Sequence, residues 1–144
     1  MILTMKRLLS FAAALVGIFA FISFPDLDIR ILGIGAHRNF LFHSVAIVLI
    51  LHLFMMKKDS SKSHWLILNS ILVGIGIGMG IHLAIDVFQR KAVLFPFVGS
   101  LVDGTSLDDR LWLGANSLGS FLISYWTFLR CKPGLSRGGS AKAE

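Results

Sequence analysis

The sequence predicts an all-α integral membrane protein, built as a bundle of four transmembrane helices with both termini in the cytoplasm. Hydrophobic residues make up 55% of the chain, charged residues only 15%, and the mean hydropathy is +0.76. A soluble domain of 144 residues needs more polar surface than this to cover its core. The apolar residues also form four separate runs, each close to the ~20 residues that a helix needs to cross a bilayer. Short basic runs flank these segments, as is typical of membrane proteins.

The four predicted spans cover about residues 8–24, 40–56, 65–88 and 111–129. The first follows Lys6 and Arg7, as the apolar part of a signal peptide would, but no small-residue cleavage site follows it. We therefore expect it to remain as a helix. The length indicates one domain, residues 1–131, and the Gly/Ser-rich residues 132–144 are expected to form a disordered cytoplasmic tail.

The basic residues predict the orientation, because Lys and Arg favour the cytoplasmic side. Nine of the fourteen lie on the side of both termini: Lys6, Arg7, Lys57, Lys58, Lys62, Arg130, Lys132, Arg137 and Lys142. The opposite side carries six of the eight acidic residues. We expect that side to face the periplasm, lumen or exterior, in a bacterial inner (plasma) membrane or an internal membrane. Because the basic residues form no single patch, the net charge of +6 does not indicate nucleic-acid binding.

Glycines alternate in the third predicted span, at Gly74, Gly76, Gly78 and Gly80. No Lys-Ser/Thr follows them, so they do not form a nucleotide-binding loop. They instead make two overlapping small-xxx-small pairs, which allow a neighbouring helix to approach closely. We expect a packing role, and membrane lipids together with a protein partner or a second copy of the chain are the expected partners.

Ionisable side chains at membrane depth are costly, so they mark candidate functional sites. The helix order brings most of them to the outer end of the bundle: Asp26, Asp28, His37, Arg38, His43, His82 and Asp86. His82 and Asp86 are four residues apart and therefore share one helical face. Asp103, Asp108 and Asp109 lie on the same side, and the last two are interpreted as caps of the fourth helix.

Imidazole nitrogens and carboxylate oxygens together indicate a divalent metal site, with zinc expected first and manganese or iron as alternatives. The predicted ligands are Asp26, Asp28, His37, His43, His82 and Asp86. A bound metal would lower the pKa of its water to about 7 and so supply a nucleophile. The predicted catalytic residues are Asp26, which could also bridge a second metal, and Arg38, which would hold an anionic group such as a phosphate.

Each part of this pattern also has a structural interpretation. A His-x-x-x-Asp pair is commonly a simple hydrogen-bonded pair. The Pro-Asp-Leu-Asp segment could end the first helix in a turn, and Arg38 could reach to the lipid headgroups. His43 and His82 could ligate haem from facing helices, although haem has no need of the carboxylates beside them.

The motifs resemble those of the YdjM-like membrane-bound metal-dependent hydrolases. They are Pro25-Asp26-Leu27-Asp28, His37-Arg38 with His43-Ser44, His82 with Asp86, and Pro96-Phe97. Order and rough spacing agree over residues 24–97, about half of the chain. The chain departs from the family pattern at Asn39, where many members have Gly, and has no His before His37. This family is thought to be distantly similar to zinc-dependent phospholipase C and P1 nuclease, which implies a helical metal hydrolase acting on phosphoesters.

Two functions from different classes follow. In the first, the chain is a membrane-embedded metal-dependent hydrolase acting on a phosphoester, for which lipid headgroups are a local supply. In the second, it is a non-enzymatic assembly or interaction factor in which the His/Asp cluster only stabilises the fold. A site short of one ligand would bind a single metal ion or serve as a structural element.

Overall fold

The computed structural model describes residues 2–33, 41–55, 63–88 and 109–131. This part of the chain contains helices and turns and no strand. The helices are α1 (Ile2–Ile22), α2 (Leu27–Leu32), α3 (Ala46–Met55), α4 (Ser63–Val87) and α5 (Asp109–Cys131). The all-α prediction is thus confirmed. The predicted tail and the loop with Asp103, Asp108, Pro96 and Phe97 lie outside the described residues.

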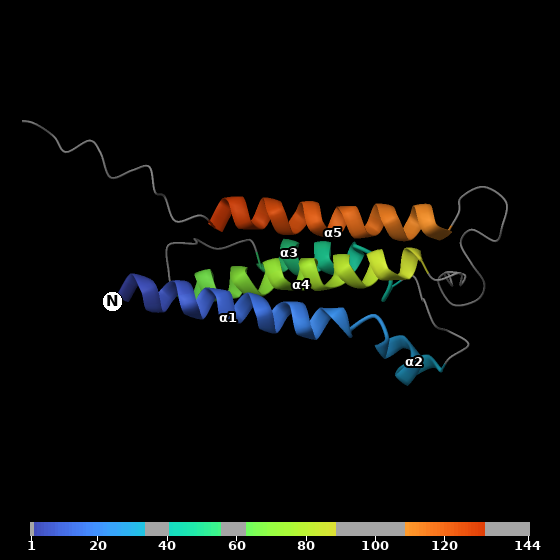
Figure 1. The fold of residues 1–144 in the computed structure, drawn as a ribbon, viewed down its shortest axis with the longest axis horizontal. Coiled ribbons are helices and arrows are strands. Elements are labelled where there is room, and N and C mark those ends of the chain that lie inside the picture. Colours follow the sequence, from blue (N-terminus) through green and yellow to red (C-terminus); the bar gives the residue numbers. More distant parts are fainter. Residues whose placement is uncertain (1, 34–40, 56–62, 89–108, 132–144) are drawn as a thin grey trace, which may run out of the picture.

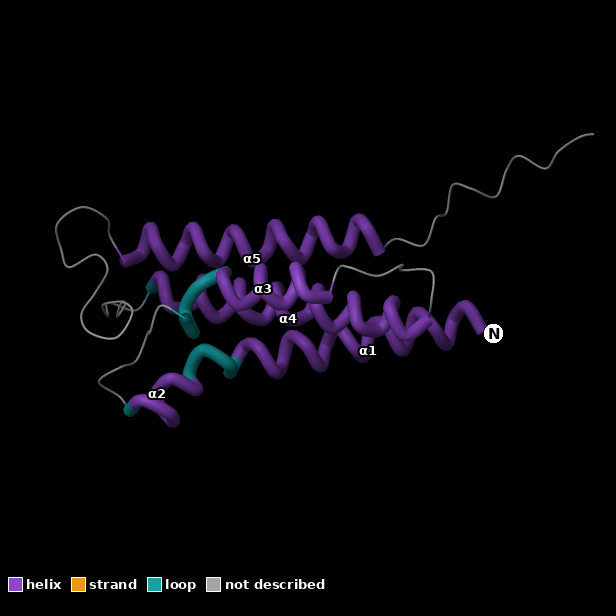
Figure 2. The backbone as a smooth tube through the Cα atoms, turned by 180° about the vertical axis from the view of Figure 1, so that it is seen from behind, coloured by secondary structure: helices purple, strands orange, loops and turns teal. Residues whose placement is uncertain are grey.

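The long helices lie side by side, with α4 in the middle (Figure 1). Helix α4 contacts α1 on one side and α5 on the other, and the shorter α3 packs on both α4 and α5. Figure 2 shows the same arrangement from behind, with α2 leading away from the end of α1. The buried core therefore centres on α4, which contributes Leu72, Ile75, Met79 and Leu83. Val48 of α3 and Leu113 of α5 complete this cluster.

Glycines allow α4 to occupy this central position. A Cβ atom at Gly74 would overlap the carbonyl oxygen of Ala14, and one at Gly78 would lie 2.5 Å from the carbonyl oxygen of Ile18, so both glycines face α1. Gly76 and Gly80 face the opposite way, toward α5. The predicted packing role is confirmed, and both glycine faces contact helices of the same chain. The expected partner protein or second copy stays a prediction.

The second predicted helix begins later than expected. Residues 41–45 form turns, and α3 starts at Ala46 rather than at about residue 40. Side-chain acceptors hold this turn: Ser44 Oγ accepts from the Ala46 N–H at 3.3 Å, and Asn116 Oδ1 of α5 accepts from the Val45 N–H at 2.9 Å. The short helix α2 was also not predicted. A turn was the structural interpretation considered for the Pro-Asp-Leu-Asp segment that leads into it.

Two of the described helices are long and apolar enough to cross a membrane, over Met5–Ile22 and His64–Val87. Helix α3 is apolar but has only 10 residues. Helix α5 has 23 residues, but its serines, threonine and asparagine lower its mean hydropathy. On length and composition, two of the four predicted spans are therefore matched in the described residues.

Candidate metal centre

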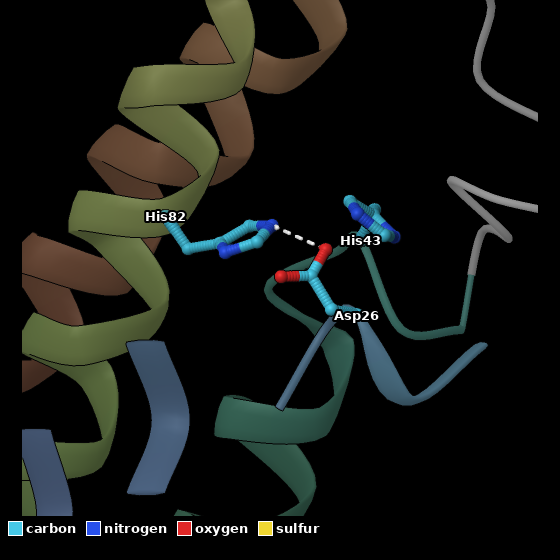
Figure 3. A group of neighbouring side chains, drawn as sticks. All are labelled: Asp26, His43 and His82. Carbon is cyan, nitrogen blue, oxygen red and sulfur yellow. Dashed lines mark ion pairs between the residues drawn. The ribbon is translucent and has the colours of Figure 1, made fainter. Parts of the chain in front are cut away.

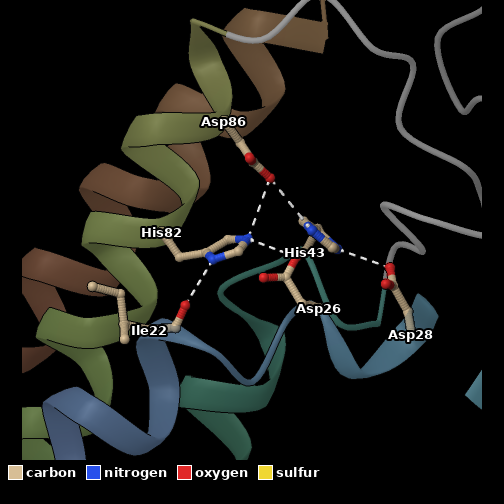
Figure 4. Close-up of polar contacts among 6 residues, drawn as sticks. All are labelled: Ile22, Asp26, Asp28, His43, His82 and Asp86. Carbon is tan, nitrogen blue, oxygen red and sulfur yellow. Dashed lines mark hydrogen bonds and ion pairs between the residues drawn. The ribbon is translucent and has the colours of Figure 1, made fainter. Parts of the chain in front are cut away.

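Three parts of the fold meet at the end of the bundle where α1 stops (Figure 4). The α1–α2 segment supplies Asp26 and Asp28, the turn before α3 supplies His43, and the last turns of α4 supply His82 and Asp86. Five of the predicted ligands thus come together. The remaining predicted ligand, His37, and the predicted anion-binding Arg38 lie outside the described residues.

His82 is oriented through the backbone of α1. Its Nδ1 lies 2.8 Å from the carbonyl oxygen of Ile22, the last residue of α1. A carbonyl at a helix C-terminus has no partner within the helix, so it accepts a hydrogen bond here, and Nδ1 must carry the donated proton. Nε2 of the neutral ring then has a lone pair and no proton.

That lone pair faces carboxylate oxygens. His82 Nε2 lies 3.4 Å from Asp86 Oδ2 and 3.9 Å from Asp26 Oδ1. The nitrogen is buried and makes no hydrogen bond among the described residues. Two acceptors held this close repel each other, so the contact is favourable only when a cation, either a proton or a metal ion, lies between them.

His43 is fully buried and lies between two carboxylates. Its Nδ1 is 3.3 Å from Asp28 Oδ2, and its Nε2 is 3.4 Å from Asp86 Oδ2. The rings of His43 and His82 meet edge to face with centroids 5.4 Å apart. Asp86 Oδ2 is therefore close to Nε2 of both rings, where a haem iron would have to lie, and the arrangement does not favour the haem interpretation.

The two aspartates of the Pro-Asp-Leu-Asp segment point to different histidines. Asp26 is the N-cap residue of α2, and its side chain is 53% exposed. Asp28 lies in the first turn of α2 and is completely buried. Residues two apart in a helix differ by about 200° around its axis, which explains why one carboxylate approaches His82 and the other approaches His43.

The spacing fits a metal site. Asp26, His43 and His82 each offer one ligand atom, and these atoms all lie within 4.8 Å of one another (Figure 3). Ligands at about 2.0–2.1 Å from a tetrahedral zinc ion lie roughly 3.3–3.4 Å apart, and both Nε2–Asp86 distances are 3.4 Å. Hydrogen-bonded N and O atoms would lie at about 2.7–3.2 Å. The described donor set can therefore hold a divalent cation.

Two features of the site were missed from the sequence. The Ile22 carbonyl is a backbone group, and no residue type signals it. Asn116 fixes the turn two residues after His43, and its Nδ2 donates to the Trp112 carbonyl at 2.8 Å. The sequence did offer a signal for Asn116, because it is a polar residue within an apolar run. His52, another buried histidine, lies in α3 away from the site and donates from Nδ1 to the Val48 carbonyl of its own helix at 2.8 Å.

Comparison of the chain with family models, with curated proteins and with solved structures gives no match in any of the three. The resemblance to the YdjM-like hydrolases rests on the motif residues alone and stays a prediction. What the chain does must therefore be argued from the metal centre and from the surface around it.

Proposed function

We propose that the chain is a membrane-embedded metal-dependent hydrolase acting on a phosphoester, with its site at the non-cytoplasmic end of four transmembrane helices. One observation carries the proposal: the Nε2 atom of buried His82, whose Nδ1 is held by the Ile22 carbonyl, faces the carboxylates of Asp86 and Asp26. Such a set of inward-facing acceptors is what a divalent cation needs. A lone proton would instead be expected to draw its two acceptors to hydrogen-bond distance.

The surface of the bundle supports the membrane part of the proposal. Monomeric soluble proteins rarely expose large continuous apolar areas, but the outward faces of α1, α3 and α5 here are almost entirely apolar. The exposed side chains include Leu8, Phe11, Val16 and Phe19 of α1, Leu49, Leu53 and Phe54 of α3, and Leu118, Leu122, Tyr125 and Phe128 of α5. Lipid tails would cover these faces.

Helix α5 supports a further span despite its low mean hydropathy. Its asparagine, serine and threonine residues are all turned inward, where Asn116, Ser117, Ser120, Ser124 and Thr127 are buried. Its outward face carries Leu, Phe, Tyr and Trp side chains. Polar residues facing the bundle and apolar residues facing outward are typical of membrane helices, so an average over all its residues understates how apolar its outer surface is.

The ends of the helices support the proposed orientation. Lys6 and Arg7 near the start of α1 lie at the same end of the bundle as Arg130 near the end of α5 (Figure 1). The Arg130 guanidinium stacks 3.9 Å from the ring centre of Trp126, which suits a headgroup region. Basic residues favour the cytoplasmic side, so the metal centre at the opposite end would face the other compartment.

The described residues suit hydrolytic chemistry. A metal held by His43, His82, Asp86 and Asp26 would polarise a phosphoryl oxygen and lower the pKa of a bound water to about 7. His82 keeps its lone pair directed at the site because Ile22 holds its other nitrogen. Asp26 is the exposed member, so its carboxylate is reachable by water and substrate and can accept a proton from the attacking water. The predicted role of Arg38 as an anion clamp completes the proposal.

Apolar side chains around the site favour a lipid phosphoester as the substrate. Ile85 and Phe88 flank Asp86 at the end of α4, and they are 52% and 85% exposed. Leu41, two residues before His43, is also exposed. A substrate with acyl chains could contact these side chains from the membrane while its phosphate reaches the metal centre.

A structural role for the His/Asp cluster is the second candidate, as in a non-enzymatic assembly factor. Each histidine lies within ion-pair distance of two carboxylates. Protonated histidines would therefore tie α2, α4 and the turn before α3 together without any metal. In that case the cluster would bind no divalent cation and would only stabilise the bundle.

Metal content separates the two candidates. Elemental analysis of detergent-purified protein, prepared without chelator, is expected to give one or two zinc, manganese or iron ions per chain. His82→Ala and Asp86→Ala should both lose the metal. His52→Ala is the matched control, because His52 is also buried but donates to its own helix, and this variant should keep the full metal content.

Wild-type protein that carries no metal and takes up none from added zinc would overturn the hydrolase proposal in favour of the structural candidate. If metal is present, phosphate release from phospholipid and from soluble phosphoesters is the next measurement. Asp26→Asn, at normal protein levels, should abolish hydrolysis, whereas a scaffold would keep working with this substitution.

A further inference from the structure

The second aspartate of the Pro-Asp-Leu-Asp segment has a role that differs from that of the first. Asp28 Oδ2 lies 3.3 Å from Nδ1 of His43, whereas the other carboxylate on this ring, Asp86, lies 3.4 Å from Nε2. In Figure 4 the two carboxylates approach opposite sides of the His43 ring. Because the two imidazole nitrogens point away from each other, an oxygen placed at one of them is remote from a metal bound to the other.

We infer that Asp28 is a positioning residue for His43 and not a metal ligand. This inference rests on the metal centre proposed above. With an Nε2–zinc bond of about 2.0–2.1 Å, the Asp28 oxygen would lie roughly 7 Å from the ion. From its own place it can accept the Nδ1 proton of His43, which leaves Nε2 with the lone pair that a metal requires.

The two histidines are then oriented in the same way by different groups. His82 Nδ1 is held by the backbone carbonyl of Ile22 at 2.8 Å, and the carboxylate of Asp28 lies within ion-pair distance of His43 Nδ1, at 3.3 Å. Metal-bound histidines typically donate their second N–H to a carbonyl or a carboxylate, which fixes both the tautomer and the ring orientation. Both Nε2 atoms consequently point at Asp86, and the two outer partners come from α1 and α2.

Burial supports the distinction between the aspartates. Asp28 and His43 are both 0% exposed, whereas the Asp26 side chain is 53% exposed. A fully buried carboxylate requires a compensating partner, and the buried His43 ring lies directly against it. Asp26, at the open edge, is the aspartate of this segment that can meet both the metal and the substrate.

Metal affinity and coordination together test this inference. Asp28→Ala and Asp28→Asn are compared with Asp86→Ala by zinc competition against a chelating dye and by the visible spectrum of cobalt-loaded protein. Asp28→Ala is expected to bind as many ions per chain as the wild type, with a Kd about 10–100-fold higher. Its cobalt bands should be unchanged, since the ligands are the same. Asp28→Asn keeps an acceptor oxygen and should recover part of the affinity, which also covers the case in which the alanine variant does not fold.

Three results would overturn the inference. A cobalt spectrum altered by Asp28→Ala in the way that Asp86→Ala alters it would make Asp28 a ligand. A smaller number of ions per chain in either Asp28 variant would place Asp28 on a second metal. An unchanged Kd in both variants would remove the positioning role. Wild-type protein that takes up neither zinc nor cobalt is a separate result, because it overturns the proposed function itself.

Discussion

Two groups of buried polar side chains lie in this bundle, and they satisfy their polar atoms differently. The first is the polar seam of α5, formed by Asn116, Ser117, Ser120, Ser124 and Thr127. Most of its donors reach backbone carbonyls: Ser117 bonds Gly80 at 2.7 Å, Ser120 bonds Asn116 at 2.9 Å, and Thr127 bonds Ile123 at 2.9 Å. The second group is the candidate metal centre, where Nε2 of His82 faces carboxylates.

The difference separates packing from binding. A hydroxyl that donates to a carbonyl is satisfied within the chain, so Ser117, Ser120 and Thr127 need no ligand. In the seam, the Ser124 hydroxyl makes no hydrogen bond to the described residues. An imidazole nitrogen that faces carboxylates needs a cation, either a proton or a metal ion, between them. The seam therefore stabilises helix contacts within the bundle, whereas the candidate metal centre brings together groups that could hold a cation.

Zinc should stabilise the folded protein through the metal centre and not through the seam. At a free zinc concentration 1,000 times the Kd, binding to the folded state alone adds about 4 kcal/mol to the free energy of unfolding. His82→Ala should lose this increment, because it removes a ligand. Thermal unfolding in detergent, with and without zinc, measures it.

Ser117→Ala is the control from the seam. Ser117 donates to the carbonyl of Gly80, two residues before His82 on α4, yet it contributes no ligand atom. The variant should show the full zinc increment. An equal increment in wild type and His82→Ala would contradict the assignment of the cation to this site.

Substitutions on the two glycine faces of α4 should affect the metal centre and the polar seam of α5 separately. An alanine Cβ at Gly78 would lie 2.5 Å from the Ile18 carbonyl oxygen, one turn before the Ile22 carbonyl that holds His82. Gly78→Ala should therefore cost about 1–3 kcal/mol of stability and also weaken zinc binding. Unfolding in detergent and zinc titration measure the two effects.

Gly76→Ala is the counterpart on the other face. Its Cβ would meet Ser124 Oγ and lie 3.0 Å from the Ser120 carbonyl oxygen, so it should destabilise the protein while leaving the zinc Kd within a few-fold of wild type. Gly114→Ala is the neutral control, because the nearest side-chain atom, Val87 Cγ2, is 4.0 Å away. If Gly78→Ala and Gly76→Ala weaken zinc binding equally, the two faces are not independent.

Asn116 belongs to the seam but should also affect the metal centre. Its Oδ1 accepts from the Val45 N–H at 2.9 Å, two residues after His43. Asn116→Ala leaves this N–H without its acceptor, which should cost about 1–3 kcal/mol and raise the zinc Kd several-fold. Asn116→Asp retains an acceptor and should keep the affinity closer to wild type. An unchanged zinc Kd in the alanine variant would mean that the turn carrying His43 keeps its conformation without the Asn116 hydrogen bond.

The sequence was sufficient to predict the helical class and the grouping of five of the six proposed ligands, because both depend on residue types. The apolar runs predicted the long helices, and the cost of ionisable groups in a membrane directed attention to His43, His82 and Asp86. The predicted start of the second helix, at about residue 40, was too early. Residues 41–45 form turns, and the Val45 N–H bonds to Asn116, which is 71 residues away in the sequence and so gives no local signal. The Ile22 carbonyl could not be predicted, since it acts through the backbone and through the end of α1. The position of Asp28 also depends on the unpredicted helix α2.

The smallest effect is expected within the seam itself. Thr127 donates to the carbonyl of Ile123 one turn earlier in α5, at 2.9 Å, so its hydrogen bond joins no second helix. Buried polar contacts in membrane proteins average about 0.6 kcal/mol, and Thr127→Val, which keeps the shape of the side chain, should change stability by no more than this. Its zinc Kd should equal that of wild type. A loss above about 2 kcal/mol in detergent unfolding would show that the seam, like the metal centre, depends on a contact beyond its own helix.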